Sequence, residues 1–444
     1  MIESLHQLLR RDSALINRHT LGVAAVFSAK VVASGVGFLV SIMLARLLGA
    51  GGLGLYFLAM TIIGIGATVS RLGLENVVLR YAAVASERND RSTLAALYRK
   101  SMGLVTGAGV FVGGLIFFLL PQLTLGGERS AELQRLLPLA LMTLLPGTLI
   151  LLQGEFFKAV GRPGMGTLVQ ETFGALLMAA GTGLFFLFGV SGVERVVLLQ
   201  AVSVGLVLLL AALVWHRCQP GLWRLPGSFD TGVLLRTGFP LLWVTGMSLV
   251  MNWTDILVLG YWSDPAVVGM YGVANRVAML TVFILTTVNS VTAPRFAALY
   301  AEEDHRGLRR LAQQSAGWML LAALPVILLL LIAPGWVLQF FGADFAKGSP
   351  LLRILVLGQF VNLATGSVGY LLMMTGHERI MRNLIALAAG LNLAGNLLLV
   401  PLLGAEGAAV STALSLALMN LGSFVMVKRK LGINTLGYLK GMIS

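Results

Sequence analysis

Charged and polar side chains inside long apolar stretches are the residues of this sequence that could do chemistry. Lys30 lies about nine residues into such a stretch, roughly 13 Å along a helix. In lipid, an ionisable group at that depth costs at least about 2.5–3.5 kcal/mol, so it must face a cavity or a partner. Ser34, Gly37 and Ser41 follow at helical spacing and form one small, polar face. The lysine could bind an anion there; alternatively it extends toward water or pairs with an acid.

A second polar stripe lies near the middle of the chain. Thr245, Ser248, Asn252 and Asp255 recur every three or four residues, so they share one face of an otherwise apolar helix. Arg276 lies near the start of the next apolar stretch. We expect an Asp255–Arg276 ion pair, since neither charge should be left unpaired in lipid. Two alternatives stay open: a carboxylate that binds a proton or another ion, and packing between helices.

Amide side chains form two further stripes in the second half of the sequence. Gln359 and Asn362 belong to one, and Asn392 and Asn396 form the other. Amides can hydrogen-bond sugar hydroxyls, and they can equally bond a neighbouring helix, typically for about 0.6 kcal/mol. We favour helix packing for the Asn392–Asn396 pair.

Two acids and two bases cluster near the ends of the fourth and fifth apolar stretches. Glu155 and Lys158 are three residues apart and can pair on one helical face. With Arg162 and Glu171 they are typical of a solvated helix end.

About twelve apolar stretches position these residues. The chain is 57% hydrophobic and 11% charged, against about 25% charged in soluble domains. A bilayer core needs roughly 20 apolar residues per helix. We therefore predict an all-α polytopic membrane protein with about 12 transmembrane helices. The predicted spans are residues 21–47, 53–70, 101–121, 136–153, 167–189, 193–215, 234–261, 268–292, 315–334, 351–375, 384–400 and 405–427.

The formal net charge of +13 is distributed unevenly between alternate loops. With the N-terminus inside, about 23 Lys and Arg residues fall on the cytoplasmic side and about 6 on the other. The basic loops are residues 1–20, 71–100, 158–163, 217–230, 295–310, 377–382 and the tail from 428. The charge is therefore an orientation signal, which predicts cytoplasmic termini and contact with membrane lipids and disfavours nucleic acid as a partner.

The two halves of the chain carry similar short motifs in the same order. A Gly49–Gly54–Tyr56 element opens the second apolar stretch, and Gly269 and Tyr271 open the eighth. An even number of helices per half predicts parallel repeats related by an axis along the membrane normal, with a cleft between them. We expect an N-terminal six-helix lobe over residues 1–216, a cytoplasmic linker over 217–233, and a C-terminal lobe with a short basic tail over 234–444.

Several of these motifs support a family resemblance. Residues 44–56, LARLLGAGGLGLY, resemble the signature of the polysaccharide-export flippases, as do Arg71-Leu72-Gly73-Leu74 and Arg80-Tyr81. Residues 255–260 leading to Gly269-Met270-Tyr271 are similar to the same family. This O-antigen (Wzx-type) family belongs to the multidrug/oligosaccharidyl-lipid/polysaccharide transporter superfamily, and the resemblance covers nearly the whole chain.

The resemblance implies two six-helix lobes around a central cavity that opens alternately to either face. It implies movement of an undecaprenyl-diphosphate-linked oligosaccharide from the cytoplasmic to the outer leaflet of a bacterial inner membrane, for lipopolysaccharide-type surface glycans. A polysaccharide polymerase and a chain-length regulator are candidate partners. We expect no catalytic residue, cofactor or metal. The expected substrate-binding residues are Lys30, Ser34, Ser41, Asn252, Asp255, Arg276, Gln359 and Asn362.

Two alternative functions are weighed against the flippase. A multidrug/toxin extruder of the same fold should present acids in its first helix, where this chain has Lys30. A membrane-embedded glycan polymerase or ligase should carry a large outer loop, whereas residues 122–135 and 335–350 are short. Export of peptidoglycan precursors or teichoic acid is a further variant. No nucleotide-binding or metalloprotease motif is present, and the single cysteine, Cys218, allows no intramolecular disulfide.

Overall fold

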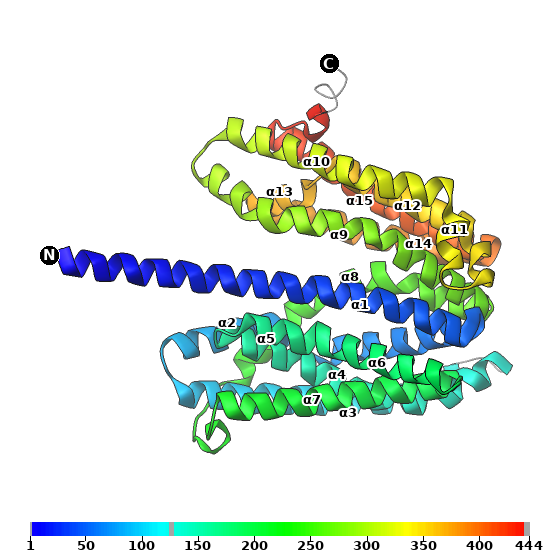
Figure 1. Ribbon diagram of the computed structural model, residues 1–444, viewed down its shortest axis with the longest axis horizontal. Helices are drawn as coiled ribbons and strands as arrows, with labels where there is room; N and C mark the ends of the chain where they lie inside the picture. Colours follow the sequence, from blue (N-terminus) through cyan, green and yellow to red (C-terminus); the bar gives the residue numbers. More distant parts are fainter. Residues whose placement is uncertain (1, 124–127, 439–444) are drawn as a thin grey trace. The chain divides into compact units, whose positions relative to one another are not determined.

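The computed structural model describes residues 2–123 and 128–438, and within these residues it contains helices and no strand (Figure 1). The side chains of Val244 and Ser248 lie outside the description, so the predicted place of Ser248 in the polar stripe is not addressed. The predicted all-helical class is confirmed.

The helices follow one another through short connections. Their order is α1 (Ile2–Ser70), α2 (Leu74–Glu87), α3 (Arg91–Leu123), α4 (Glu128–Ala159), α5 (Pro163–Thr167), the π-helical turn η1 (Leu168–Thr172), α6 (Phe173–Leu187), α7 (Val193–Cys218), η2 (Leu222–Arg224), α8 (Thr231–Trp262), α9 (Pro265–Ala301), α10 (His305–Ile332), α11 (Pro334–Gln339), η3 (Ala343–Gly348), α12 (Ser349–Thr365), α13 (Val368–Met374), α14 (Glu378–Leu403), α15 (Ala405–Leu431) and η4 (Thr435–Gly437).

Most of these helices are long and apolar enough to cross a membrane. Within the described residues there are nine such helices, and up to eleven if each of two bent pairs is one span. One of the nine, Ser28–Ser70, is 43 residues long and is interrupted by non-helical backbone at Gly49. It includes most of the predicted span 21–47 and all of the predicted span 53–70. The chain is therefore a multi-pass membrane protein, and the count of twelve stays a prediction.

The chain forms two compact units. Unit 1 consists of Met1–Leu47 and Ile62–Thr245, and unit 2 consists of Leu48–Thr61 and Gly246–Ser444. The chain therefore leaves unit 1 near Gly49, returns within α1, and leaves it again in the middle of α8. The predicted lobes and linker place the boundaries elsewhere, and as functional units they stay a prediction.

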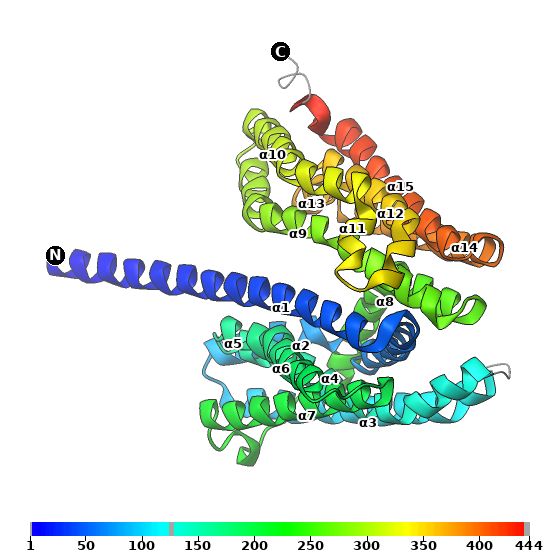
Figure 2. The same cartoon turned by 45° about the vertical axis from the view of Figure 1, so that its right-hand side comes forward.

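Unit 1 is built on α2, α3, α4 and α7, which lie side by side in both views (Figures 1 and 2). Aromatic rings fill its core: Tyr98 stacks on Trp215 with ring centroids 5.1 Å apart, and Phe156 and Phe157 pack beside them. Basic residues of α3 donate hydrogen bonds to the segment that precedes α8. Arg99 donates to the carbonyl of Leu225 at 2.8 Å, and Lys100 donates to that of Phe229 at 2.6 Å.

Unit 2 packs α12 against α9, α10 and α15, and α14 against α15. The unit-2 part of α1 crosses α9 at closely apposed glycines. A Cβ on Gly54 would collide with the Pro265 carbonyl, and one on Gly269 would collide with the carbonyl of Ala50. Glycine at both positions permits this approach, as in other close helix crossings in membranes. The two glycine–tyrosine motifs of the sequence are therefore in contact in one unit.

A break between α12 and α13 lies within one bent pair of apolar helices. The bend is 46°, and Gly366 adopts a φ of 74° there. Helix ends leave carbonyl groups without helical partners, and in lipid these must be satisfied internally. The chain after α15 supplies the donors: Thr435 bonds the Thr365 carbonyl at 2.9 Å, and Tyr438 bonds that of Ala364 at 3.2 Å.

Candidate functional site

A buried carboxylate in unit 2 collects hydrogen bonds from three other helices. Asp255 on α8 is 2% exposed. It accepts from Tyr271 on α9, from Thr412 on α15 at 2.6 Å and from Asn396 on α14 at 2.7 Å, with Asn392 at 3.4 Å. The favoured interpretation of Asn392 and Asn396 as interhelical hydrogen-bonding residues is confirmed, because they join α14 to α8.

The predicted Asp255–Arg276 ion pair is wrong. Among the described residues, the hydrogen bonds of the Asp255 carboxylate all come from neutral side chains, and the Arg276 guanidinium lies 5.0 Å from the ring centre of Phe57. The reason is helical geometry. Tyr271 reaches the carboxylate, and five residues later the helix has turned about 140° away from that direction, so Arg276 leaves α9 toward a different neighbour.

The groups around Asp255 could hold a small cation. The amide oxygens of Asn392 and Asn396 are buried and have no hydrogen-bond partner within the described residues. Amide orientation is assigned from the hydrogen-bond network, so a rotated amide would present oxygen in place of nitrogen. A carboxylate, a hydroxyl and amide oxygens are ligands that hard cations prefer, and the carboxylate can also take a proton. The ion-binding interpretation of Asp255 therefore stays open.

A cavity of about 470 Å³ in unit 2 brings several predicted residues together. Four of the predicted substrate-binding residues line it: Asn252, Asp255, Arg276 and Gln359. The Arg276 side chain is exposed to this space, whereas Asp255 is buried in its wall. Asn362, a fifth predicted residue, is buried and donates to Gln359 at 3.2 Å, so it positions the glutamine from behind.

Sequence reasoning missed part of the cavity wall. Tyr56, Phe57, Trp253 and Asn275 also line it. The sequence pointed to one of them, because Tyr56 ends the glycine motif that brings α1 against α9. Nothing in the local sequence indicated that residues about 200 positions apart would line one space.

The other three predicted residues lie in unit 1. Lys30 and Ser34 are exposed, whereas Ser41 is buried and donates to the Gly37 carbonyl of its own helix at 2.7 Å. The Lys30 ammonium lies 3.9 Å from a carboxylate oxygen of Glu171. The structure therefore separates the predicted site into a unit 1 group and a unit 2 group, and the roles of all eight residues stay predictions.

The predicted Glu155–Lys158 pair is confirmed, at 2.8 Å. Gln170 donates to Glu155 at 2.9 Å and to the Leu151 carbonyl at 2.7 Å, so the pair is held between α4 and η1. Glu171 contacts Lys30 instead of joining this cluster. The interpretation of all these charges as one solvated helix end therefore does not describe Glu171.

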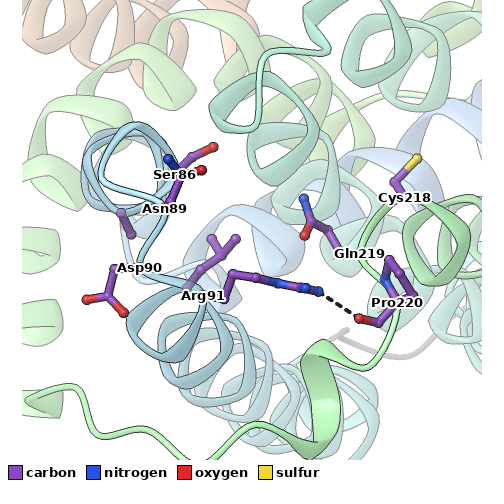
Figure 3. Close-up of a pocket in the computed structure, with 9 residues that line it drawn as sticks. Ser86, Asn89, Asp90, Arg91, Cys218, Gln219 and Pro220 are labelled. Atoms are coloured by element: carbon purple, nitrogen blue, oxygen red, sulfur yellow. Dashed lines mark hydrogen bonds between the residues drawn. The ribbon is translucent and has the colours of Figure 1, made fainter.

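A second cavity, of about 280 Å³, lies where the α2–α3 turn meets the end of α7 (Figure 3). Its polar groups already serve the turn. Arg91 donates to the Pro220 carbonyl at 2.7 Å, and Asp90 caps α3 by accepting from Thr93 and Ser92. The hydrogen bonds from Thr93 and Ser92 lower the pKa of Asp90 to about 2. This cavity is therefore a structural feature of unit 1.

Taken together, the apolar spans and the polar groups buried among them define a multi-pass helical membrane protein with polar and charged sites inside its units. The family model described as "Polysaccharide biosynthesis protein" matches residues 20–300, which is more than half of the chain. The chain belongs to this family. A second model, MatE, matches residues 240–398.

Comparisons with individual proteins agree with this assignment. The chain is 23% identical over 411 residues to the "Probable low-salt glycan biosynthesis flippase Agl15" of Haloferax volcanii, covering 91% of this chain and 83% of that protein. It is 26% identical over 181 residues to the "Probable flippase AglR" of the same organism, covering 40% of this chain and 37% of that protein.

Two solved structures show the same fold. The lipid II flippase MurJ in an inward closed conformation gives a TM-score of 0.72 at 13% identity, covering 96% of this chain and 92% of that one. An inward-facing multidrug resistance MATE family transporter gives 0.70 at 15% identity, covering 90% and 94%. These likenesses show the fold. The predicted membership of the superfamily is confirmed by the two family models together with the flippase relative.

Proposed function

We propose that this chain flips an undecaprenyl-diphosphate-linked oligosaccharide from the cytoplasmic to the outer leaflet by alternating access. The family assignment and the flippase names of its relatives favour transport over an enzymatic role. In this proposal the chain serves surface polysaccharide synthesis in a bacterial inner membrane, with both termini in the cytoplasm. A polysaccharide polymerase and a chain-length regulator are its proposed partners.

The observation that carries the proposal is the composition of the unit 2 cavity. Arg276 supplies a guanidinium group, whose fork of N–H donors matches phosphate oxygens. Asn252, Asn275 and Gln359 supply amides for sugar hydroxyls. At about 470 Å³ the cavity falls in the range of small-ligand sites, so it would take the diphosphate and part of a glycan while the lipid tail stays in the bilayer.

The Asp255 cluster offers a way to couple transport to an ion. It is in the wall of the same cavity, so binding of a proton or a monovalent cation there would change the charge next to the substrate. The cluster joins α8, α9, α14 and α15 through hydrogen bonds to one carboxylate. Loss of that charge would weaken bonds to three helices at once, which is a route from ion binding to helix movement.

A multidrug/toxin extruder is the second candidate. It is favoured by the MatE match and by the likeness to an inward-facing transporter of that family. Against it, the accessible charges at the two groups of predicted residues include the cations Lys30 and Arg276, which would repel a cationic drug.

Transport by the full chain in proteoliposomes tests the proposal. Vesicles carry a fluorescent undecaprenyl-diphosphate-linked glycan, and a membrane-impermeant quencher reports its arrival in the far leaflet. We expect Arg276→Ala to lower the rate at least tenfold. Arg353→Ala is the matched control, because Arg353 is an exposed unit 2 arginine that bonds the Leu331 carbonyl away from the cavity.

Each alternative has its own result in that assay. Transport of a fluorescent organic cation in place of the glycan lipid would establish the extruder and overturn the flippase. Transport of a dolichyl-linked but not an undecaprenyl-linked glycan would keep the general function and overturn the proposed lipid carrier. Equal rates for wild type and Arg276→Ala would remove the cavity from the mechanism.

A further inference from the structure

Two opposite charges meet within the spans of unit 1. Lys30 lies on α1, and Glu171 lies in the π-helical turn η1, within the candidate span Pro163–Leu187. Glu171 follows Pro163 by eight residues, which is about 12 Å along a helix. Charges at such depth are rare in membrane proteins and usually belong to a pathway for a polar or charged species.

This pair differs from Glu155–Lys158, another ion pair of the same unit. The Lys158–Glu155 distance is 2.8 Å, and the two side chains are 29% and 14% exposed. The Lys30–Glu171 distance is 3.9 Å, longer than a charge-assisted hydrogen bond, and the side chains are 55% and 43% exposed. Lys158 and Glu155 are therefore tightly bonded and mostly covered. Lys30 and Glu171 attract each other while both side chains stay about half exposed.

The side chains on either side of Glu171 anchor its turn of helix. On one side, Thr172 donates to the Ala29 carbonyl, next to Lys30, at 3.2 Å. On the other side, Gln170 is bonded to Leu151 and Glu155. π-helical turns inside α-helices are frequent at functional sites, because the extra residue re-aims the side chains that follow. The turn that carries Glu171 is therefore anchored beside Lys30, although the two side chains are not hydrogen-bonded to each other.

We propose that Glu171 is a specificity-determining residue, an internal anion that occupies Lys30 until a phosphate-bearing substrate displaces it. The inference rests on the proposed function, since it requires an anionic lipid head. A diphosphate carries more negative charge than a carboxylate, so it can displace Glu171 from the Lys30 ammonium. A weakly charged lipid cannot displace it. After the exchange, the displaced carboxylate repels the bound anion and so assists its release.

Glu171 also answers two physical requirements on Lys30: a tolerable cost in the membrane and release of the bound anion. A lone lysine in lipid is costly, and a neighbouring acid lowers that cost. A cation that binds its anion too tightly would trap it, and transport requires binding weak enough to permit exit. The competition between Glu171 and the substrate for one ammonium satisfies both requirements.

Binding of inorganic pyrophosphate to the full chain in phosphatidylcholine nanodiscs tests the proposal by calorimetry. We expect Glu171→Gln to tighten binding about three- to fivefold, the order of effect of a half-exposed charge pair. Glu171→Asp, which keeps the charge, should bind as the wild type does. Lys30→Gln should abolish the gain when combined with Glu171→Gln.

Asp344→Asn is the matched control. Asp344 pairs with Lys347 at 3.4 Å, three residues apart in an exposed segment, so its removal also frees a lysine. It should leave pyrophosphate affinity unchanged. An equal gain in Asp344→Asn would show that any freed lysine binds the probe, and this result would overturn the proposal.

Other outcomes separate this inference from the flippase itself. If Glu171→Gln binds pyrophosphate no more tightly than wild type while Arg276→Ala still lowers glycan flipping, the role of Glu171 fails and the proposed function stands. If Glu171→Gln gains affinity as expected but no lipid-linked glycan is moved, the anion exchange stands and the proposed function fails. Equal elution and melting temperatures of the variants would establish that folding is not the cause.

Discussion

Two membrane-embedded carboxylates of this protein, Asp255 and Glu171, have opposite surroundings. In unit 2, Asp255 is buried and takes its hydrogen bonds from neutral hydroxyls and amides on three helices. In unit 1, Glu171 is half exposed and faces a cation across 3.9 Å. A carboxylate enclosed by hydroxyl and amide donors can exchange a proton or a small cation. A carboxylate in an open ion pair can be displaced by a larger anion. In the proposed mechanism the enclosed carboxylate of unit 2 serves ion coupling, and the open pair of unit 1 contributes to binding the substrate anion alongside Arg276.

The largest expected effect is at Asp255. Asp255→Asn keeps the shape and can still accept from Tyr271 and Thr412, so the protein should reach the membrane at normal levels with transport lowered at least tenfold. Asp255→Ala should in addition lower stability, because each buried donor left without an acceptor costs about 1–3 kcal/mol. Membrane levels, detergent melting temperatures and flipping rates measure both. A normal flipping rate in Asp255→Asn would contradict the ion-coupling role of Asp255, because the charge would then be dispensable for transport.

Lys30 is expected to show a loss of function with little loss of protein. Lys30→Ala removes the cation and should abolish glycan export while leaving the chain in the membrane. Lys30→Arg should rescue partly, because the charge is kept but the shape is not. Lys30→Glu should fail, because it places two acids together beside Glu171. Complementation of a flippase-deficient strain with quantified membrane levels measures this, and export by Lys30→Ala at the normal rate would contradict it.

The crossing of α1 and α9 should govern the shape of the unit 2 cavity. Gly54→Ala places a methyl group against the Pro265 carbonyl, so helices that carry Phe57 and Arg276 must separate. Overpacking of this kind typically costs about 1–3 kcal/mol. Gly51→Ala is the control, because nothing lies within 4 Å of a Cβ at that position. The melting temperature should fall for Gly54→Ala alone, and an equal fall in both would contradict the close crossing.

The smallest effect is expected at the segment after α15. Thr435→Val removes the donor to the Thr365 carbonyl, and Tyr438→Phe removes the donor to that of Ala364. A typical hydrogen bond contributes about 0.5–1.5 kcal/mol, so each variant should melt slightly earlier. The flipping rate should fall only slightly, because the variants affect the cavity only through a shift of α12, which carries Gln359. An unchanged melting temperature in the double variant would show that the carbonyls of Thr365 and Ala364 have other hydrogen-bond donors.

Several features of the site followed from sequence because they depend on local periodicity. The Glu155–Lys158 pair is set by a spacing of three residues on one helix. The bonding of Asn392 and Asn396 to another helix follows from the need of an amide in lipid for a partner. The identity of that partner did not follow. Tyr271 and Arg276 are on the same helix, and only the rotation of α9 against α8 decides which of them meets Asp255.

The sequence by itself determined that this is a multi-pass helical membrane protein with charges inside its spans, because hydrophobic length and charge depth are properties of contiguous residues. It also determined the family, through motifs that stay together in the chain. The tertiary structure alone decided which charges are enclosed and which are open. Asp255 receives bonds from residues up to 157 positions away, and Glu171 meets Lys30 through a π-helical turn that local propensity does not indicate. Those contacts depend on how helices rotate against one another, which no single stretch of sequence specifies.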